Sequence, residues 1–171
     1  MKFVFEKISR DVTRGAFDCG VASLNDYVKR YALQNLKKNV GVTVIAVPED
    51  NRKRILGYYS VSMGQVEFKL LPEDLAKGLP RYPVPAMRIG RLAVDRSTQG
   101  MGVGAALLRD ALLRAVELSR KVGTCVVLVD AIDESAMKFY ERYGFIPLKD
   151  IPLTLVLPVE TIAAAFELCS V

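Results

Sequence analysis

The chain has 171 residues, of which 51% are hydrophobic and 25% are charged. This length is typical of one globular domain, so we expect a single domain over residues 1–171. No stretch approaches the roughly 20 uncharged apolar residues that span a bilayer, and we expect no membrane partner. The N-terminal segment interrupts its apolar residues with charges and lacks the apolar core of a signal peptide, which favours a cytoplasmic protein.

The absence of histidine restricts the chemistry available to the chain. It removes the usual general base near neutral pH and every mechanism that depends on imidazole. Cys19, Cys125 and Cys169 are far apart and form no metal-ligand spacing, so we expect neither disulfides nor a metal. The net charge of +5 fits an acidic partner such as nucleic acid or a phosphorylated cofactor, but many ordinary enzymes are equally basic.

Strand and helix patterns alternate along the first half of the chain. Leu24, Tyr27, Val28 and Tyr31 share one helical face, and Ser23 with Asp26 resembles a capping box. The predicted elements are a strand over 2–9, a helix over 23–38, a hairpin of runs 40–48 and 54–68, and a proline-rich loop over 71–87 with a short helix at 72–78.

The second half predicts a strand, a glycine loop and a long helix, and then a central strand. Asp133 is a plausible N-cap and Gly144 a plausible stop for the helix between them. Five residues keep the spacing of one buried face of the long helix: Leu108, Ala111, Leu112, Ala115 and Val116. The other predicted elements are strands over 88–95, 124–132, 145–148 and 154–158 and helices over 133–144 and 159–168, which together indicate a mixed α/β domain.

Three glycines, Gly100, Gly102 and Gly104, separate the strand over 88–95 from the long helix. A glycine loop that opens a helix aims unpaired backbone N–H groups and the positive end of the helix dipole at one point, which makes an anion site. A tight turn with close helix packing is an equally valid interpretation of a lone glycine triplet.

Two common phosphate-binding loops, the Walker loop and the dinucleotide-binding loop, fit this sequence poorly. A Walker loop needs Lys and then Ser or Thr where Ala105 and Ala106 stand. A dinucleotide fold could use Gly100, Gly102 and Ala105 with Asp130 as the ribose-binding acid. About 40 residues follow Asp130, too few for a second mononucleotide-binding half.

Gln99, Gly102 and Gly104 match the Q/R-x-x-G-x-G/A signature of the GNAT superfamily of acyl-CoA N-acyltransferases, and residues 139–145, FYERYGF, match its aromatic helix. The segments FDCGVASLNDYVKRYALQN, LGYYSVS and LPRYPVPAMRIGRLAVD resemble the GNAT toxins of bacterial toxin–antitoxin pairs. This resemblance implies a mixed, mostly antiparallel sheet of about six or seven strands flanked by helices. It also implies an acetyl-CoA-dependent enzyme that acetylates the α-amine of aminoacyl-tRNA by direct attack in a ternary complex, inhibits translation, forms a homodimer and is held by a ribbon-helix-helix antitoxin.

The resemblance also implies where acetyl-CoA binds. The diphosphate would lie on the backbone of the loop over 99–104, and a strand N–H would stabilise charge on the thioester oxygen. The candidate cofactor contacts are Leu92, Ala93, Val94, Gln99, Gly100, Met101, Gly102, Val103, Gly104, Asp133 and Phe139.

Tyr140 is the candidate that protonates the leaving thiolate, because its phenol is protonated at neutral pH. Helical spacing alone favours Tyr140 as a core residue, as it does Phe139 and Phe145, and Tyr143 is a second hydroxyl candidate. Many GNAT relatives have an asparagine where this chain has Asp133, whose charge would repel phosphate. The resemblance also implies a carboxylate base, for which the strand over 88–95 offers only Asp95, so water or the amine's own pKa could serve instead.

Candidate contacts to tRNA phosphates are basic side chains near the first helix and the proline loop, with Arg91 the strongest. They are Lys29, Arg30, Lys37, Lys38, Arg81, Arg88 and Arg91. Two alternatives remain. One is a GNAT enzyme acting on a small amine, a protein N-terminus or lysine; the other is a non-catalytic module that senses acyl-CoA or holds a partner.

Overall fold

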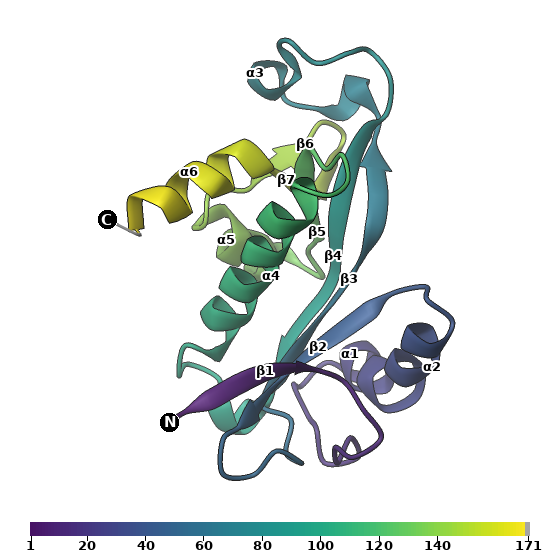
Figure 1. Ribbon diagram of the computed structural model, residues 1–171, viewed down its shortest axis with the longest axis vertical. Coiled ribbons are helices and arrows are strands. Elements are labelled where there is room, and N and C mark those ends of the chain that lie inside the picture. Colours follow the sequence, from purple (N-terminus) through teal and green to yellow (C-terminus); the bar gives the residue numbers. More distant parts are fainter. Residues whose placement is uncertain (170–171) are drawn as a thin grey trace. The chain divides into compact units, whose positions relative to one another are not determined.

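The computed structural model describes residues 1–169 (Figure 1). The chain packs as two compact units, the first made of Met1–Ser62 and Gly90–Ala111, and the second of Met63–Ile89 and the chain from Leu112 onward. Three elements contribute residues to both units, namely β3 (Gly57–Val66), β4 (Val84–Val94) and α4 (Val103–Ser119). The side chain of Cys169, one of the three cysteines considered above, lies outside what the structure describes.

Within residues 1–169, seven strands form one mixed sheet in the order β1-β2-β3-β4-β5-β7-β6. β4 and β5 pair in parallel, while β1 with β2, β2 with β3, β5 with β7 and β6 with β7 are antiparallel. The predicted fold class, a mostly antiparallel sheet with helices, is therefore confirmed. The remaining strands are β1 (Phe3–Lys7), β2 (Val42–Pro48), β5 (Val126–Asp130), β6 (Ile146–Leu148) and β7 (Ile151–Pro158).

In the first unit, a helical segment packs on strands through a core of aliphatic and aromatic side chains. The segment consists of α1 (Ala22–Asp26), a π-helical turn (Tyr27–Tyr31) and α2 (Ala32–Lys37). Its Tyr27, Val28 and Ala32 are buried against Ile45 of β2 and Tyr58 of β3. This packing confirms the predicted apolar helical face for Tyr27 and Val28.

Two details of this helix differ from the prediction. The N-cap is Val21, and neither Ser23 nor Asp26 forms the expected capping box. Tyr31 is 49% exposed, although helical spacing places it on the buried face. The wider π-helical turn adds a residue to the repeat, so Ala32 takes the buried position instead.

The hairpin is confirmed, since β2 pairs with β3 in antiparallel register from Val42 opposite Val61 to Ala46 opposite Gly57. β4 begins at Val84, four residues earlier than the strand predicted from Arg88. Pro85 is tolerated there because a strand residue without an N–H can still accept a bond, and its carbonyl accepts one from Cys125 N–H at 2.9 Å.

In the second unit, β5 is buried on both faces as predicted, with Val126 to Val129 at most 1% exposed. Its side chains share a core with Leu71, Val84 and Val156. The α-helices within this unit, over the described residues, are the single turn α3 (Glu73–Ala76), α5 (Glu134–Glu141) and α6 (Val159–Cys169). Among the described residues, no helix has both the length and the apolarity that crossing a bilayer would require.

Candidate active site

The loop over residues 99–104 leaves its backbone open to a ligand. Gly100 and Gly102 have φ angles of +78° and +83°, which side-chain-bearing residues rarely adopt. A Cβ placed on either residue would meet no atom within 4 Å, so open space adjoins both. The first turn of α4 follows directly, with Ala106 N–H donating to Gly102 O at 3.1 Å. The N–H groups before Ala106 have no carbonyl of the helix to bond, and they border this space.

The side chains of this loop differ in how far they are exposed to solvent. Met101 is 58% exposed, whereas Val103 is 1% exposed and belongs to the core. Val103 can therefore contact a cofactor through its backbone N–H only. Gly104 lies within the first turn of α4, where its N–H is one of the unpaired donors.

β3 approaches the end of β4 closely at Gly57, a contact that the sequence did not predict. A Cβ on Gly57 of β3 would lie 2.8 Å from Ala93 O and 2.8 Å from Leu107 Cδ1. Only glycine lets β3, β4 and the start of α4 come this close. Ala93 is buried on this side, while Leu92 and Val94 are half-buried and alternate to the opposite face.

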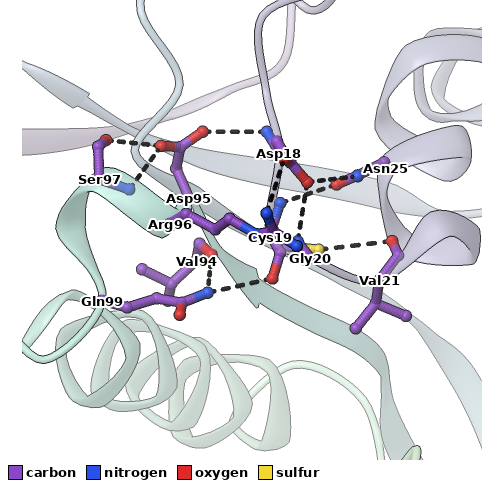
Figure 2. A network of polar contacts seen from close by, with 10 residues as sticks. All are labelled: Asp18, Cys19, Gly20, Val21, Asn25, Val94, Asp95, Arg96, Ser97 and Gln99. Atoms are coloured by element: carbon purple, nitrogen blue, oxygen red, sulfur yellow. Dashed lines mark hydrogen bonds and ion pairs between the residues drawn. The ribbon is translucent and has the colours of Figure 1, made fainter.

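A network of polar contacts fixes the loop that precedes the glycines (Figure 2). Asp95 follows β4 and caps the 3-10 turn Arg96–Thr98 by accepting a hydrogen bond from Ser97 N–H at 3.0 Å. Its second oxygen accepts one from Asp18 N–H at 3.0 Å. Thr98 is buried and donates to Leu56 O at 3.2 Å. These bonds tie the loop to Leu56, the residue before β3, and to the N-terminal segment of the same unit.

Gln99 is held on the protein side of this network rather than facing the open space. Its Nε2 donates to Cys19 O at 3.1 Å and to Val94 O at 3.0 Å. Figure 2 shows the side-chain amide between these two carbonyls. The signature residue Gln99 thus has a structural partner on each side, and its side-chain nitrogen is fully used.

Asp95 is a poor general base. Burial alone raises the pKa of its carboxyl, but hydrogen bonds from Asp18 N–H and from Ser97, together with the charge of Arg54, outweigh burial and hold the pKa below its usual value. Cys19 is no nucleophile at neutral pH either, because burial raises the pKa of its thiol. Neither group supplies the base that the resemblance implies.

Tyr140, in the second unit, lies in an aromatic cluster. Its ring packs edge-on against Phe139 at 5.3 Å and Phe145 at 5.6 Å between centroids, and only 4% of the residue is exposed. No hydrogen bond engages its hydroxyl within the described part of the chain. Burial, and then the charge of Asp130, raises the pKa of Tyr140 far above its usual value, so the phenol keeps its proton.

Asp130, which a dinucleotide fold would use as its ribose-binding acid, is engaged by two neighbouring side chains. Its Oδ2 accepts a hydrogen bond from Arg88 Nη1 at 2.7 Å, and its Oδ1 accepts one from Thr154 Oγ1 at 3.3 Å. Both side chains of the Arg88–Asp130 ion pair are about one-third exposed. Because its charge is paired, Arg88 is less available to RNA phosphates than an unpaired cation would be.

Asp133 is the N-cap that the sequence predicts, with its Oδ1 accepting from Ala136 N–H at 2.8 Å. Gly144, with a φ of +92°, ends the helix as predicted. Phe139 is half-buried between Tyr140 and Tyr143 and also lies 5.7 Å from the guanidinium of Arg142. Tyr143 is 43% exposed, and Phe145 is a core residue.

The other basic candidates differ in how free their charges are. The Arg91 guanidinium lies 3.7 Å over the centre of the buried Tyr27 ring. Arg30 forms an exposed ion pair with Asp26 at 3.5 Å, a contact of little energetic weight. Lys37, Lys38 and Arg81 are exposed, and Lys29 is half-buried. No group of His, Cys, Asp and Glu side chains within residues 1–169 is arranged to hold a metal.

Comparisons with known proteins identify the family of this fold. The model of the acetyltransferase (GNAT) domain matches residues 41–147. A tRNA-acetylating toxin of Mycobacterium tuberculosis is 36% identical over 147 residues, which cover 86% of this chain and 85% of that protein. A probable toxin TacT of Sinorhizobium fredii is 31% identical over 157 residues, which cover 87% of this chain and 86% of that protein.

Solved structures agree with these relatives. The toxin AtaT in complex with acetyl-methionyl-tRNAfMet superposes with a TM-score of 0.90 at 30% identity, covering 96% of this chain and 99% of that chain. A mutant of AtaT bound to the C-terminus of the antitoxin AtaR and acetyl-CoA superposes with a TM-score of 0.82 at 28% identity, covering 96% of this chain and 98% of that chain.

Proposed function

We propose, since the chain belongs to the GNAT acetyltransferase family, that it transfers the acetyl group of acetyl-CoA to the α-amino group of an aminoacyl-tRNA. The observation that carries this proposal is the nearly complete overlap with a tRNA-acetylating toxin and with a toxin structure that holds acetyl-methionyl-tRNA. An overlap of this extent includes the helices and loops outside the GNAT core, where a substrate is chosen. Residues 1–171 then act as one acyltransferase domain.

The glycine loop fits the diphosphate of acetyl-CoA. The space beside Gly100 and Gly102 is open, and unpaired N–H groups of the α4 N-terminus border it. The pantetheine arm would follow β4 along Leu92, Ala93 and Val94, where a strand N–H can stabilise charge on the thioester oxygen. Asp133 and Phe139 are the remaining candidate contacts. The carboxylate of Asp133 caps α5, and the ring of Phe139 is half-buried, so its exposed part would be what a cofactor could contact.

Tyr140 is proposed as the proton donor to the departing thiolate. Burial keeps its phenol protonated, and its hydroxyl is not committed to another described residue. Acetyl-CoA supplies a thioester that an unprotonated amine attacks directly in a ternary complex. Because Asp95 is held as a carboxylate of low basicity, the amine must lose its proton to water. An α-amine suits this route, since its pKa is near 8 and that of a lysine side chain is near 10.

The product explains a toxic effect. An acetylated α-amine is an amide nitrogen, which no longer attacks a peptidyl ester, so the modified tRNA cannot accept a growing peptide. The enzyme would act in the cytoplasm as a homodimer, with an antitoxin of the ribbon-helix-helix class as its inhibitor. The structure of AtaT with the C-terminus of AtaR supports an antitoxin partner. Contacts to tRNA phosphates are assigned to Lys29, Arg30, Lys37, Lys38, Arg81, Arg88 and Arg91.

The test is to incubate the purified chain and radiolabelled acetyl-CoA with one acceptor at a time. The acceptors are charged tRNA, uncharged tRNA, polyamines and a peptide. We expect label on charged tRNA alone. Tyr140→Phe keeps the ring packing and removes the hydroxyl, and it should lower kcat by about 100-fold or more. Tyr143→Phe removes the second candidate hydroxyl and should keep wild-type kcat if Tyr140 is the donor. Label on the polyamine or peptide instead of tRNA would overturn the proposed substrate.

A further inference from the structure

Residues 18–20 face the segment that leads into the glycine loop and bond to it repeatedly (Figure 2). We call residues 18–20 the clasp. Asp18 O accepts a hydrogen bond from Arg96 N–H at 2.8 Å, and Asp18 N–H donates to Asp95 Oδ2 at 3.0 Å. Cys19 O accepts from Gln99 Nε2 at 3.1 Å. Three hydrogen bonds therefore join the clasp to Asp95, Arg96 and Gln99, at the two ends of residues 95–99.

The clasp is itself held in one shape. Asp18 Oδ1 accepts from Gly20 N–H and from Asn25 Nδ2, both at 2.9 Å. Asn25 Oδ1 in turn accepts from Cys19 N–H at 2.9 Å. Gly20 has a φ of +89°, and a Cβ there would lie 3.0 Å from Arg96 Nε. The direction of the Cys19 carbonyl is thus fixed by its neighbours on both sides.

Gln99 is the last link before the glycines. Its single side-chain nitrogen donates to two carbonyls, Cys19 O in the clasp and Val94 O at the end of β4. The next residue, Gly100, has the left-handed backbone that begins the open part of the loop. Any rotation of residue 99 would change the direction of the N–H groups that follow.

We infer that Gln99 is a positioning residue, which binds acetyl-CoA indirectly by locking the glycine loop to the clasp through donated hydrogen bonds. This inference rests on the proposed function, because it assumes that the loop binds the diphosphate. It accounts for the Q/R choice at the first position of the signature, since glutamine and arginine share side-chain N–H donors that two carbonyls can accept. A residue that only accepts cannot replace them.

The experiment compares Gln99→Glu with Gln99→Arg. Glutamate has nearly the same shape but no donor at neutral pH, and its charge faces two carbonyl oxygens. Losing two hydrogen bonds should raise the Kd and the KM for acetyl-CoA by about tenfold, with kcat at saturating acetyl-CoA within about twofold of wild type. Gln99→Arg should keep the Kd and the KM for acetyl-CoA near their wild-type values. Gln65→Glu, an exposed site in the second unit, makes the same charge change and should leave both unchanged.

Asn25→Asp provides a second variant that leaves Gln99 in place. It sets a carboxylate against Asp18 and removes the Nδ2 donor, so the clasp loosens and the KM for acetyl-CoA should rise again. Amide hydrogen exchange of residues 99–104 should quicken in both loosened variants. Thermal unfolding of each variant separates this local effect from loss of fold.

The outcomes separate the inference from the proposed function. Failure of the wild-type chain to bind acetyl-CoA by calorimetry would overturn the proposed function. If the wild-type chain binds acetyl-CoA and Gln99→Glu binds it equally well, the inference is overturned while the proposed function stands. A Gln99→Arg variant as weak as Gln99→Glu would also overturn it, because donors would then not be what the position requires.

Discussion

At the scale of single residues, the environment of Tyr140 determines how activity should depend on pH. The pKa of this phenol is raised, so the neutral form that can donate a proton persists to a higher pH than in a free tyrosine, whose pKa is near 10. Asp95 is shifted in the other direction and stays ionised down to an unusually low pH. Neither group changes its protonation near neutral pH.

We therefore expect kcat/KM for aminoacyl-tRNA to rise with pH as the substrate amine loses its proton and then to stay level to about pH 9.5. Initial rates at saturating acetyl-CoA between about pH 6 and 9.5 would measure this, with a blank at each pH for hydrolysis of the aminoacyl ester. A descending limb in that range would show that the proton donor ionises earlier than a buried tyrosine does, and Tyr140 would lose its assigned role.

At the scale of elements, the approach of β3 to β4 and α4 depends on Gly57. A methyl group there would lie 2.8 Å from Ala93 O, a backbone atom that cannot move without moving β4. Gly57→Ala should lower the free energy of unfolding by about 1–3 kcal/mol, as for overpacked sites. It should also weaken acetyl-CoA binding, because the same methyl group pushes on Val103 in the first turn of α4.

Urea unfolding and calorimetry would measure these two effects. Gly15→Ala is the matched control, since a Cβ at Gly15 meets no atom within 4 Å and its φ is not positive. Equal stability of the two variants would show that β4 yields easily at this point and that Gly57 is not needed to place α4.

Hydrophobic periodicity and helix-capping residues predicted most elements, because both depend on residues that are close together in the chain. The β-branched and aromatic runs of β2 and β3, the buried face of α4, the Asp133 cap and the Gly144 stop are all local features, and the structure confirms them. The π-helical turn at Tyr27–Tyr31 was missed because Leu24, Tyr27, Val28 and Tyr31 also match the spacing of a regular α-helix. Chain-distant bonds were missed as well. The bond from Gln99 to Cys19 joins residues 80 positions apart, and no periodicity encodes it.

At the scale of the whole molecule, the net charge of +5 bears on the proposed tRNA substrate. Phosphate contacts release counterions, so affinity for tRNA should fall steeply as salt is raised. Among the candidate cations, Lys37 and Lys38 are exposed at the end of α2, and no ion pair involves them within the described residues. Their charges are the most available for phosphate.

Neutralising both, as Lys37→Gln with Lys38→Gln, should weaken tRNA binding and lower the slope of log K against log salt by about 1–2, since each phosphate contact contributes about one counterion. Glutamine keeps the helix-forming tendency of these positions. Lys53→Gln with Lys121→Gln removes the same charge from exposed sites outside the candidate set and should leave the slope nearly unchanged. Filter binding at several salt concentrations would measure both. Acetyl-CoA binding should stay at its wild-type value in both double variants. An equal fall of tRNA affinity in the two would mean that tRNA binding responds to total charge and not to a surface at α2.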